Sequence, residues 1–96
     1  MKTSIYRIYT EKRPNLAAFV AERFDGFSII AAEGYWQGKP EPCAIVELID
    51  TGVDAAETRY RVYELAEDIR VANEQTSVIV TETETFVSTF RDWKGE

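Results

Sequence analysis

The sequence predicts an α+β domain of the ferredoxin-like class, in which the elements follow one another in the order β-α-β-β-α-β. Four segments, at 4–10, 27–32, 43–49 and 77–83, alternate along their length or are rich in aromatic and β-branched residues, as strands are. Two further segments repeat their apolar residues at spacings of three and four, which is typical of amphipathic helices. Because crossover connections are right-handed, this order predicts a four-stranded antiparallel sheet with both helices on one face.

The first strand and the first helix follow from the N-terminal third of the chain. Tyr6 and Ile8 are expected on one face of the strand, and Arg7 on the other. Pro14 suits the first turn of a helix, where its missing N–H is not needed, and Gly26 suits the position just past the helix end. The apolar stripe of this helix comprises Leu16, Phe19, Val20 and Phe24. A strand at 27–32 and a loop at 34–42 are expected to follow.

The remaining elements are predicted from a long amphipathic segment and its flanks. Asp54 followed by Glu57 resembles a capping box and predicts the start of a helix that runs to about Asn73. Its inward residues are expected to be Val62, Leu65, Ala66, Ile69 and Ala72. After the fourth strand, residues 84–96 are predicted to form an aromatic tail that contains Phe86, Phe90 and Trp93. Residues 1–96 are thus expected to form a single domain.

The composition excludes several classes of function. The 96 residues carry a net charge of −6, so nucleic acid and anionic membranes are poor partners, whereas a cationic ligand would be attracted. The chain has no His and only one cysteine, Cys43, which excludes His-based catalysis and the usual zinc sites and predicts no metal. A lone thiol, the absence of an apolar leader and the absence of a long apolar run predict a cytoplasmic protein.

The sheet is expected to carry apolar side chains on both of its faces, although helices cover only one. Along the third strand, Ala44, Val46 and Leu48 alternate with residues that include Ile45 and Ile49. An exposed apolar sheet face usually marks an association surface. We therefore expect a homo-oligomer that packs through its sheets, and a homotrimer in particular.

The segment 34–42 holds the main candidates for binding a ligand. Tyr35 and Trp36 offer aromatic faces that can stack on a base or hold a cation, and Glu41, between two prolines, can hold an ammonium group. The structural alternative is a hairpin loop whose aromatic residues pack on the sheet. Glu47, in the middle of the third strand, is a further candidate, and its alternative is an interface ion pair with Arg7.

Two segments resemble a known family within the trimeric PII/CutA-like group of ferredoxin-like proteins. The first runs from Phe24-Asp25-Gly26-Phe27 to Gly34-Tyr35-Trp36 and Glu41, and the second is Asn73-Glu74-Gln75-Thr76-Ser77-Val78-Ile79-Val80-Thr81. Together they resemble the phage-encoded S-adenosylmethionine (SAM) lyases, formerly called SAM hydrolases, which destroy the methyl donor of the host and so counter restriction-modification.

The resemblance implies an enzyme without a cofactor, for which SAM is the substrate. The carboxylate of SAM attacks its own γ-carbon, and the products are 5′-methylthioadenosine and homoserine lactone. The resemblance assigns the catalytic roles to Tyr35 and Glu41, although the connection between them is shorter than in the family, so Trp36 is an alternative to Tyr35. Trp36 and Glu47 are the expected substrate-binding residues.

Two other functions remain open from the sequence. One is a non-catalytic PII-like module that binds a nucleotide-type ligand between subunits, although such proteins usually have a longer loop and basic phosphate contacts, whereas segment 34–42 offers only Lys39. The other is a structural oligomer whose aromatic loop contacts another protein.

Overall fold

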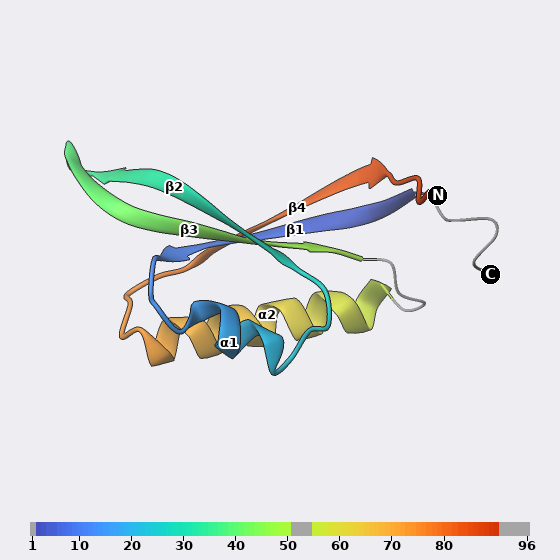
Figure 1. The fold of residues 1–96 in the computed structure, drawn as a ribbon, viewed down its shortest axis with the longest axis horizontal. Helices are drawn as coiled ribbons and strands as arrows, with labels where there is room; N and C mark the ends of the chain where they lie inside the picture. Colours follow the sequence, from blue (N-terminus) through green and yellow to red (C-terminus); the bar gives the residue numbers. More distant parts are fainter. Residues whose placement is uncertain (1, 51–54, 91–96) are drawn as a thin grey trace.

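The computed structural model describes residues 2–50 and 55–90 as six elements in the predicted order β-α-β-β-α-β. These elements are β1 (Lys2–Glu11), α1 (Leu16–Ala21), β2 (Ser28–Trp36), β3 (Lys39–Ile49), α2 (Ala55–Ala72) and β4 (Ile79–Phe86). The strands form one antiparallel sheet in the order β2-β3-β1-β4, and both helices lie on the same face of it (Figure 1). The predicted ferredoxin-like fold is therefore confirmed.

The core lies between the helices and the covered face of the sheet. It comprises Tyr6, Ile8, Leu16, Val20, Ala44, Val46, Leu48, Val62, Leu65, Ala66 and Ile69. The alternation along β1 and β3 places their core residues on one face, as predicted, and this is the face that the helices cover. Ala72 is the exception among the residues expected to point inward, because it lies in the exposed last turn of α2. Within the described residues, no helix is long and apolar enough to cross a bilayer.

The first helix and the last strand differ from their expected bounds. α1 ends at Ala21, because the N–H of Arg23 bonds to the carbonyl of Val20 and tightens the turn that follows. β4 begins at Ile79 and continues to Phe86, so that it pairs with β1 over its whole length and takes up the start of the expected aromatic tail. The predicted cap at Asp54 and the predicted tail residue Trp93 lie outside the described residues.

The expected loop at 34–42 is wrong, because this segment is a continuous hairpin. β2 and β3 stay paired up to Trp36 and Lys39, and the two residues between them, Gln37 and Gly38, have φ values of 51° and 77°. Two consecutive positive φ angles define the type I′ turn, whose twist matches that of the flanking strands.

The prolines at 40 and 42 are compatible with the hairpin because β3 has a single neighbour there. β1 pairs with β3 only as far as Cys43, so the edge of β3 that lacks N–H groups at Pro40 and Pro42 has no strand beside it. This end of the hairpin, residues 33–42, is called the ribbon below, and it reaches beyond the helices (Figure 1).

The uncovered face of the sheet has an apolar row across all four strands. Strand pairing places Ile30, Ile45, Tyr9 and Ile79 side by side in this row. Ile30 and Ile79 are 42% and 62% exposed. The face is therefore as apolar as the sequence predicts, and nothing in the described chain covers it.

Candidate active site

The register of the ribbon determines which candidate side chains share a face. Glu41 lies directly opposite Gly34, and Trp36 is two residues further along the same strand as Gly34. Since residues directly opposite each other and residues two apart share a face, Trp36 and Glu41 lie on one face of the ribbon. Tyr35 is opposite Pro40 and lies on the other face. The aromatic residue that accompanies Glu41 is therefore Trp36.

Gly34 keeps space open beside Glu41. A Cβ atom at this position would lie 3.2 Å from the Cβ of Cys43 and 3.3 Å from the carbonyl oxygen of Glu41, which is closer than most such contacts in proteins. Any larger residue would have to displace the strand that carries Glu41. The glycine therefore contributes both close strand packing and an open surface between Trp36 and Glu41.

A cleft of about 500 Å³ forms where β1 ends, between the ribbon and the connection from α2 to β4. The ribbon and the start of β3 contribute Gly34, Tyr35, Trp36, Glu41, Pro42 and Cys43. β1 contributes Tyr9 and Thr10, and the connection contributes Gln75, Thr76 and Ser77. Three of the four residues proposed from the sequence, Tyr35, Trp36 and Glu41, thus line one cleft.

The chemical groups in this cleft are available to a ligand. Tyr35 and Trp36 are each 65% exposed, so their ring faces are not used by the core. Within residues 2–50 and 55–90, the carboxylate of Glu41 forms no hydrogen bond or ion pair. An exposed, unpaired carboxylate next to aromatic rings is an arrangement that suits an organic cation.

Glu47 lies elsewhere. Its carboxylate accepts a hydrogen bond from Nε of Arg7 at 2.9 Å, which is the ion pair that the sequence offered as the alternative to a ligand role. Because Glu47 is opposite Ser28 and Arg7, it lies on the uncovered face, six residues along β3 from Glu41. Within one chain, Glu47 is therefore not part of the cleft that contains Glu41.

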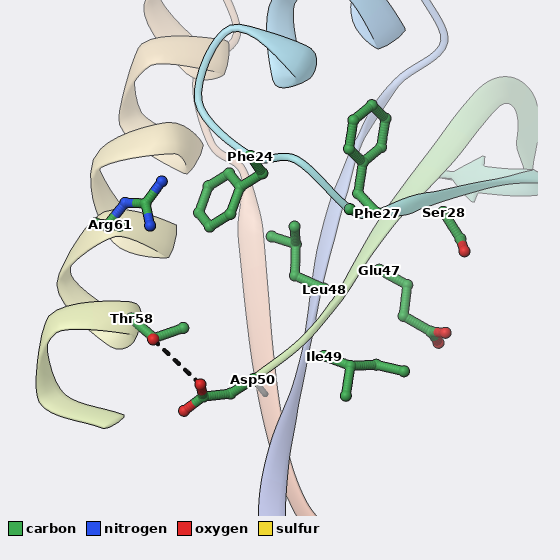
Figure 2. A pocket seen from close by; sticks show the side chains of 10 residues that line it. Phe24, Phe27, Ser28, Glu47, Leu48, Ile49, Asp50, Thr58 and Arg61 are labelled. Carbon is green, nitrogen blue, oxygen red and sulfur yellow. Dashed lines mark hydrogen bonds between the residues drawn. The ribbon is translucent and has the colours of Figure 1, made fainter. Parts of the chain in front are cut away.

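Glu47 instead lines a second cavity, of about 420 Å³, which is shown in Figure 2. Phe24, Phe27 and Leu48 supply its apolar wall. On the α2 side, Thr58 donates a hydrogen bond to the carboxylate of Asp50 at 3.2 Å, and the guanidinium of Arg61 lies 4.5 Å from the ring centre of Phe24. The charged groups of this cavity, Glu47, Asp50 and Arg61, thus each already have a partner within the chain.

The sequence interpretation missed the third wall of the first cleft, formed by Gln75, Thr76 and Ser77. In the sequence they appeared only within the second segment of the family resemblance, with Ser77 also at the start of the predicted strand 77–83. The signal that was present is the polar run from Asn73 to Ser77, which separates two apolar elements and contains hydrogen-bonding side chains at every position. Which of these side chains faces the ribbon depends on long-range packing.

Comparison with known proteins shows which solved structures share the fold of this chain. No family model and no curated protein matches the sequence. Among solved structures, a phage SAM lyase in its apo state matches with a TM-score of 0.69 and 21% identity, over 86% of this chain and 81% of that one. The chain has the fold of a phage SAM lyase. A phage SAM lyase in complex with S-methyl-5′-thioadenosine matches with a TM-score of 0.71 and 20% identity, over 85% of this chain and 81% of that one.

Proposed function

We propose that the protein is a SAM lyase and that the cleft containing Glu41 is its active site. The observation that carries the proposal is the unpaired carboxylate of Glu41, which lies on the same ribbon face as Trp36, in a cleft of a fold shared with phage SAM lyase. SAM carries a sulfonium and an α-ammonium group, so its charges suit an acidic protein with a free carboxylate.

The proposed reaction needs no group beyond the substrate and the protein. A carboxylate oxygen of SAM forms a bond to the γ-carbon while the bond between this carbon and sulfur breaks, and the electron pair of that bond goes to sulfur. The products are 5′-methylthioadenosine and homoserine lactone, and no proton has to be transferred. Holding the two reacting groups in line contributes several kcal/mol to such a step, roughly up to 7–11 in the best-oriented cases.

Each side chain of the cleft has a proposed role. Glu41 binds the α-ammonium and so fixes the carboxylate that attacks. Trp36 stacks on the adenine, and Tyr35, which reaches the cleft from the other face of the ribbon, orients the substrate. Glu47 faces another cavity within the chain, so it acts on the substrate only if a neighbouring subunit supplies it.

The proposal includes a homotrimer formed through the uncovered sheet face and a role in which a phage removes the methyl donor used by host restriction-modification enzymes. The support for the trimer is the apolar row on that face. A SAM-consuming enzyme acts where SAM is made and used, so the host cytoplasm is the proposed location.

The test is incubation of the purified protein with SAM, followed by chromatography of the products. We expect 5′-methylthioadenosine to accumulate with the native protein and to fall by at least about 100-fold with Glu41→Gln, which keeps the size of the side chain and removes its charge. The matched control is Glu33→Gln, which makes the same change at an exposed ribbon residue outside the cleft and is expected to stay active. Intact SAM that stays bound to the protein would instead favour the non-catalytic binding module.

A further inference from the structure

The connection between α2 and β4 is held in place by a hydrogen-bond cluster centred on Gln75. The amide oxygen of Gln75 accepts three bonds, from the Thr10 hydroxyl at 2.5 Å, the Asn73 amide at 3.1 Å and the Glu11 backbone N–H at 3.4 Å. Thr10 is 3% exposed, so this contact is protected from water. The side chain of Gln75 is thus oriented from three sides, and it ties the connection to the end of β1.

The backbone of the same connection is fixed as well. The N–H of Gln75 bonds to the carbonyl of Arg70 at 2.9 Å, and Nη1 of Arg70 donates to the carbonyl of Gln75 at 3.3 Å. The amide nitrogen of Gln75 in turn donates to the carbonyl of Ser77 at 3.4 Å. This short segment therefore has one preferred position, although it is neither helix nor strand.

The next two residues have polar groups to offer to the cleft. Within the described chain, the backbone N–H groups and the hydroxyls of Thr76 and Ser77 donate no hydrogen bond, and both residues line the cleft. Gln75, Thr76 and Ser77 together form what we call the polar wall. The aromatic rings of the ribbon line the same cleft, so one cleft offers both a stacking surface and fixed hydrogen-bonding groups.

This combination is what recognition of a nucleobase requires. A purine is bound by stacking on its face and is distinguished by hydrogen bonds at its edge. The edge of adenine presents an amino donor next to a ring-nitrogen acceptor, and a carbonyl and an N–H of an extended backbone can pair with both. We propose that the polar wall reads the 6-amino edge of the adenine in the ligand, and that Gln75 is the positioning residue that holds the wall at the required distance. This inference rests on the proposed function, because it assigns the base-binding part of that same site.

The test measures the dissociation constants of 5′-methylthioadenosine and 5′-methylthioinosine, which differ at position 6 of the purine, where an oxo group replaces the amino group. We expect the native protein to prefer 5′-methylthioadenosine about tenfold, the difference that one net hydrogen bond supplies. Gln75→Ala should reduce this preference to about twofold or less, because the wall is no longer held. Gln75→Glu keeps an acceptor oxygen for the three donors and should restore most of the preference.

Further variants distinguish a loss of the positioning role of Gln75 from a general loss of folded structure. If Gln75→Ala does not fold, Thr10→Val removes one of the donors at nearly constant volume and should also reduce the preference. Thr83→Val, on the strand β4 away from the cleft, is the matched control and should leave it unchanged. Equal binding of the two nucleosides by the native protein, or equal weakening of both by Gln75→Ala, would overturn the inference while leaving the proposed function intact. Binding of neither nucleoside and no turnover of SAM would overturn both.

Discussion

Charged residues on the covered side of the sheet are paired, in contrast to Glu41 in the cleft. Glu82 of β4 accepts two hydrogen bonds from the guanidinium of Arg59, each at 2.9 Å, and one from the hydroxyl of Ser4 at 3.1 Å. The bonds from Arg59, more than its charge alone, lower the pKa of Glu82. Tyr6 lies directly opposite Glu82 in the neighbouring strand, and burial, together with the charge of Glu82, raises the pKa of its hydroxyl. This network stabilises the fold, whereas Glu41, which has no partner among the described residues, is available for the proposed function.

The lowered pKa of Glu82 predicts how stability depends on pH. A carboxylate whose pKa is lower in the folded than in the unfolded state adds stability above its ordinary pKa of about 4.3 and loses it as the pH falls through the lower, folded value. We therefore expect Glu82→Gln to unfold at lower urea concentration than the native protein near neutral pH, and the difference to shrink as the pH is lowered towards about 3, because the carboxylate of the native protein becomes protonated.

The matched control is Glu84→Gln, two residues away on the same strand. Its partner Lys2 lies at 3.2 Å, but both side chains are more than 60% exposed, so solvent screens the pair and little change is expected at either pH. A stability difference for Glu82→Gln that stays constant with pH would show that the pair with Arg59 does not carry the effect.

Among the elements, the β2–β3 hairpin determines where the site residues lie. Its two-residue turn sets the register, and the register decides that Trp36 rather than Tyr35 shares a face with Glu41. Gly38 has a φ of 77°, where a Cβ atom costs about 1–2 kcal/mol. Adding one methyl group at Gly38 should therefore change the free energy of unfolding by a measurable amount.

We expect Gly38→Ala to lower the free energy of unfolding by about 1 kcal/mol in urea titrations. Gly26→Ala is the matched control, because neither glycine has an atom within 4 Å of the added Cβ, but only Gly38 has a positive φ. The control should change stability by less than about 0.5 kcal/mol, and in the stabilising direction if the backbone suits alanine. Equal losses from both substitutions would argue against the type I′ turn.

The same hairpin shows where sequence interpretation succeeds and where it ends. The order of elements, the sets of residues that share a face on β1 and β3 and most of the buried positions of α2 follow from periodicities within each segment, and the sequence predicts them. The loop expected at 34–42 is instead a paired hairpin, because Pro40 and Pro42 are tolerated in a strand that has a neighbour on one side only. That β3 has only one neighbour there depends on where β1 ends, which is a long-range property. The polar wall and its contact with the cleft were missed for the same reason.

At the scale of the whole molecule, the uncovered sheet face is the surface through which we propose that the trimer forms. Two apolar rows, one with Ile30 and Tyr9 and one with Ile5 and Ile49, flank the ion pair between Arg7 and Glu47. A single chain gains nothing from exposing these rows, whereas self-association would bury them and exclude water from the ion pair. A cleft at the edge of such a face would then lie close to a neighbouring subunit.

This interface can be tested without disturbing the core. Ile30 is 42% exposed on the uncovered face, and Val71 is 59% exposed on α2, so replacing either residue by Lys removes a similar apolar side chain that the single chain does not bury. If the sheets form the interface, Ile30→Lys should convert a species of about three times the 11.0 kDa chain mass into monomer in light scattering after size exclusion, because it places charges in a desolvated contact. Turnover of SAM should fall with it if neighbouring chains complete the site. Val71→Lys should leave both the mass and the turnover unchanged. A native protein that is already monomeric, or a trimer that persists in Ile30→Lys but dissociates in Val71→Lys, would rule out this face as the interface.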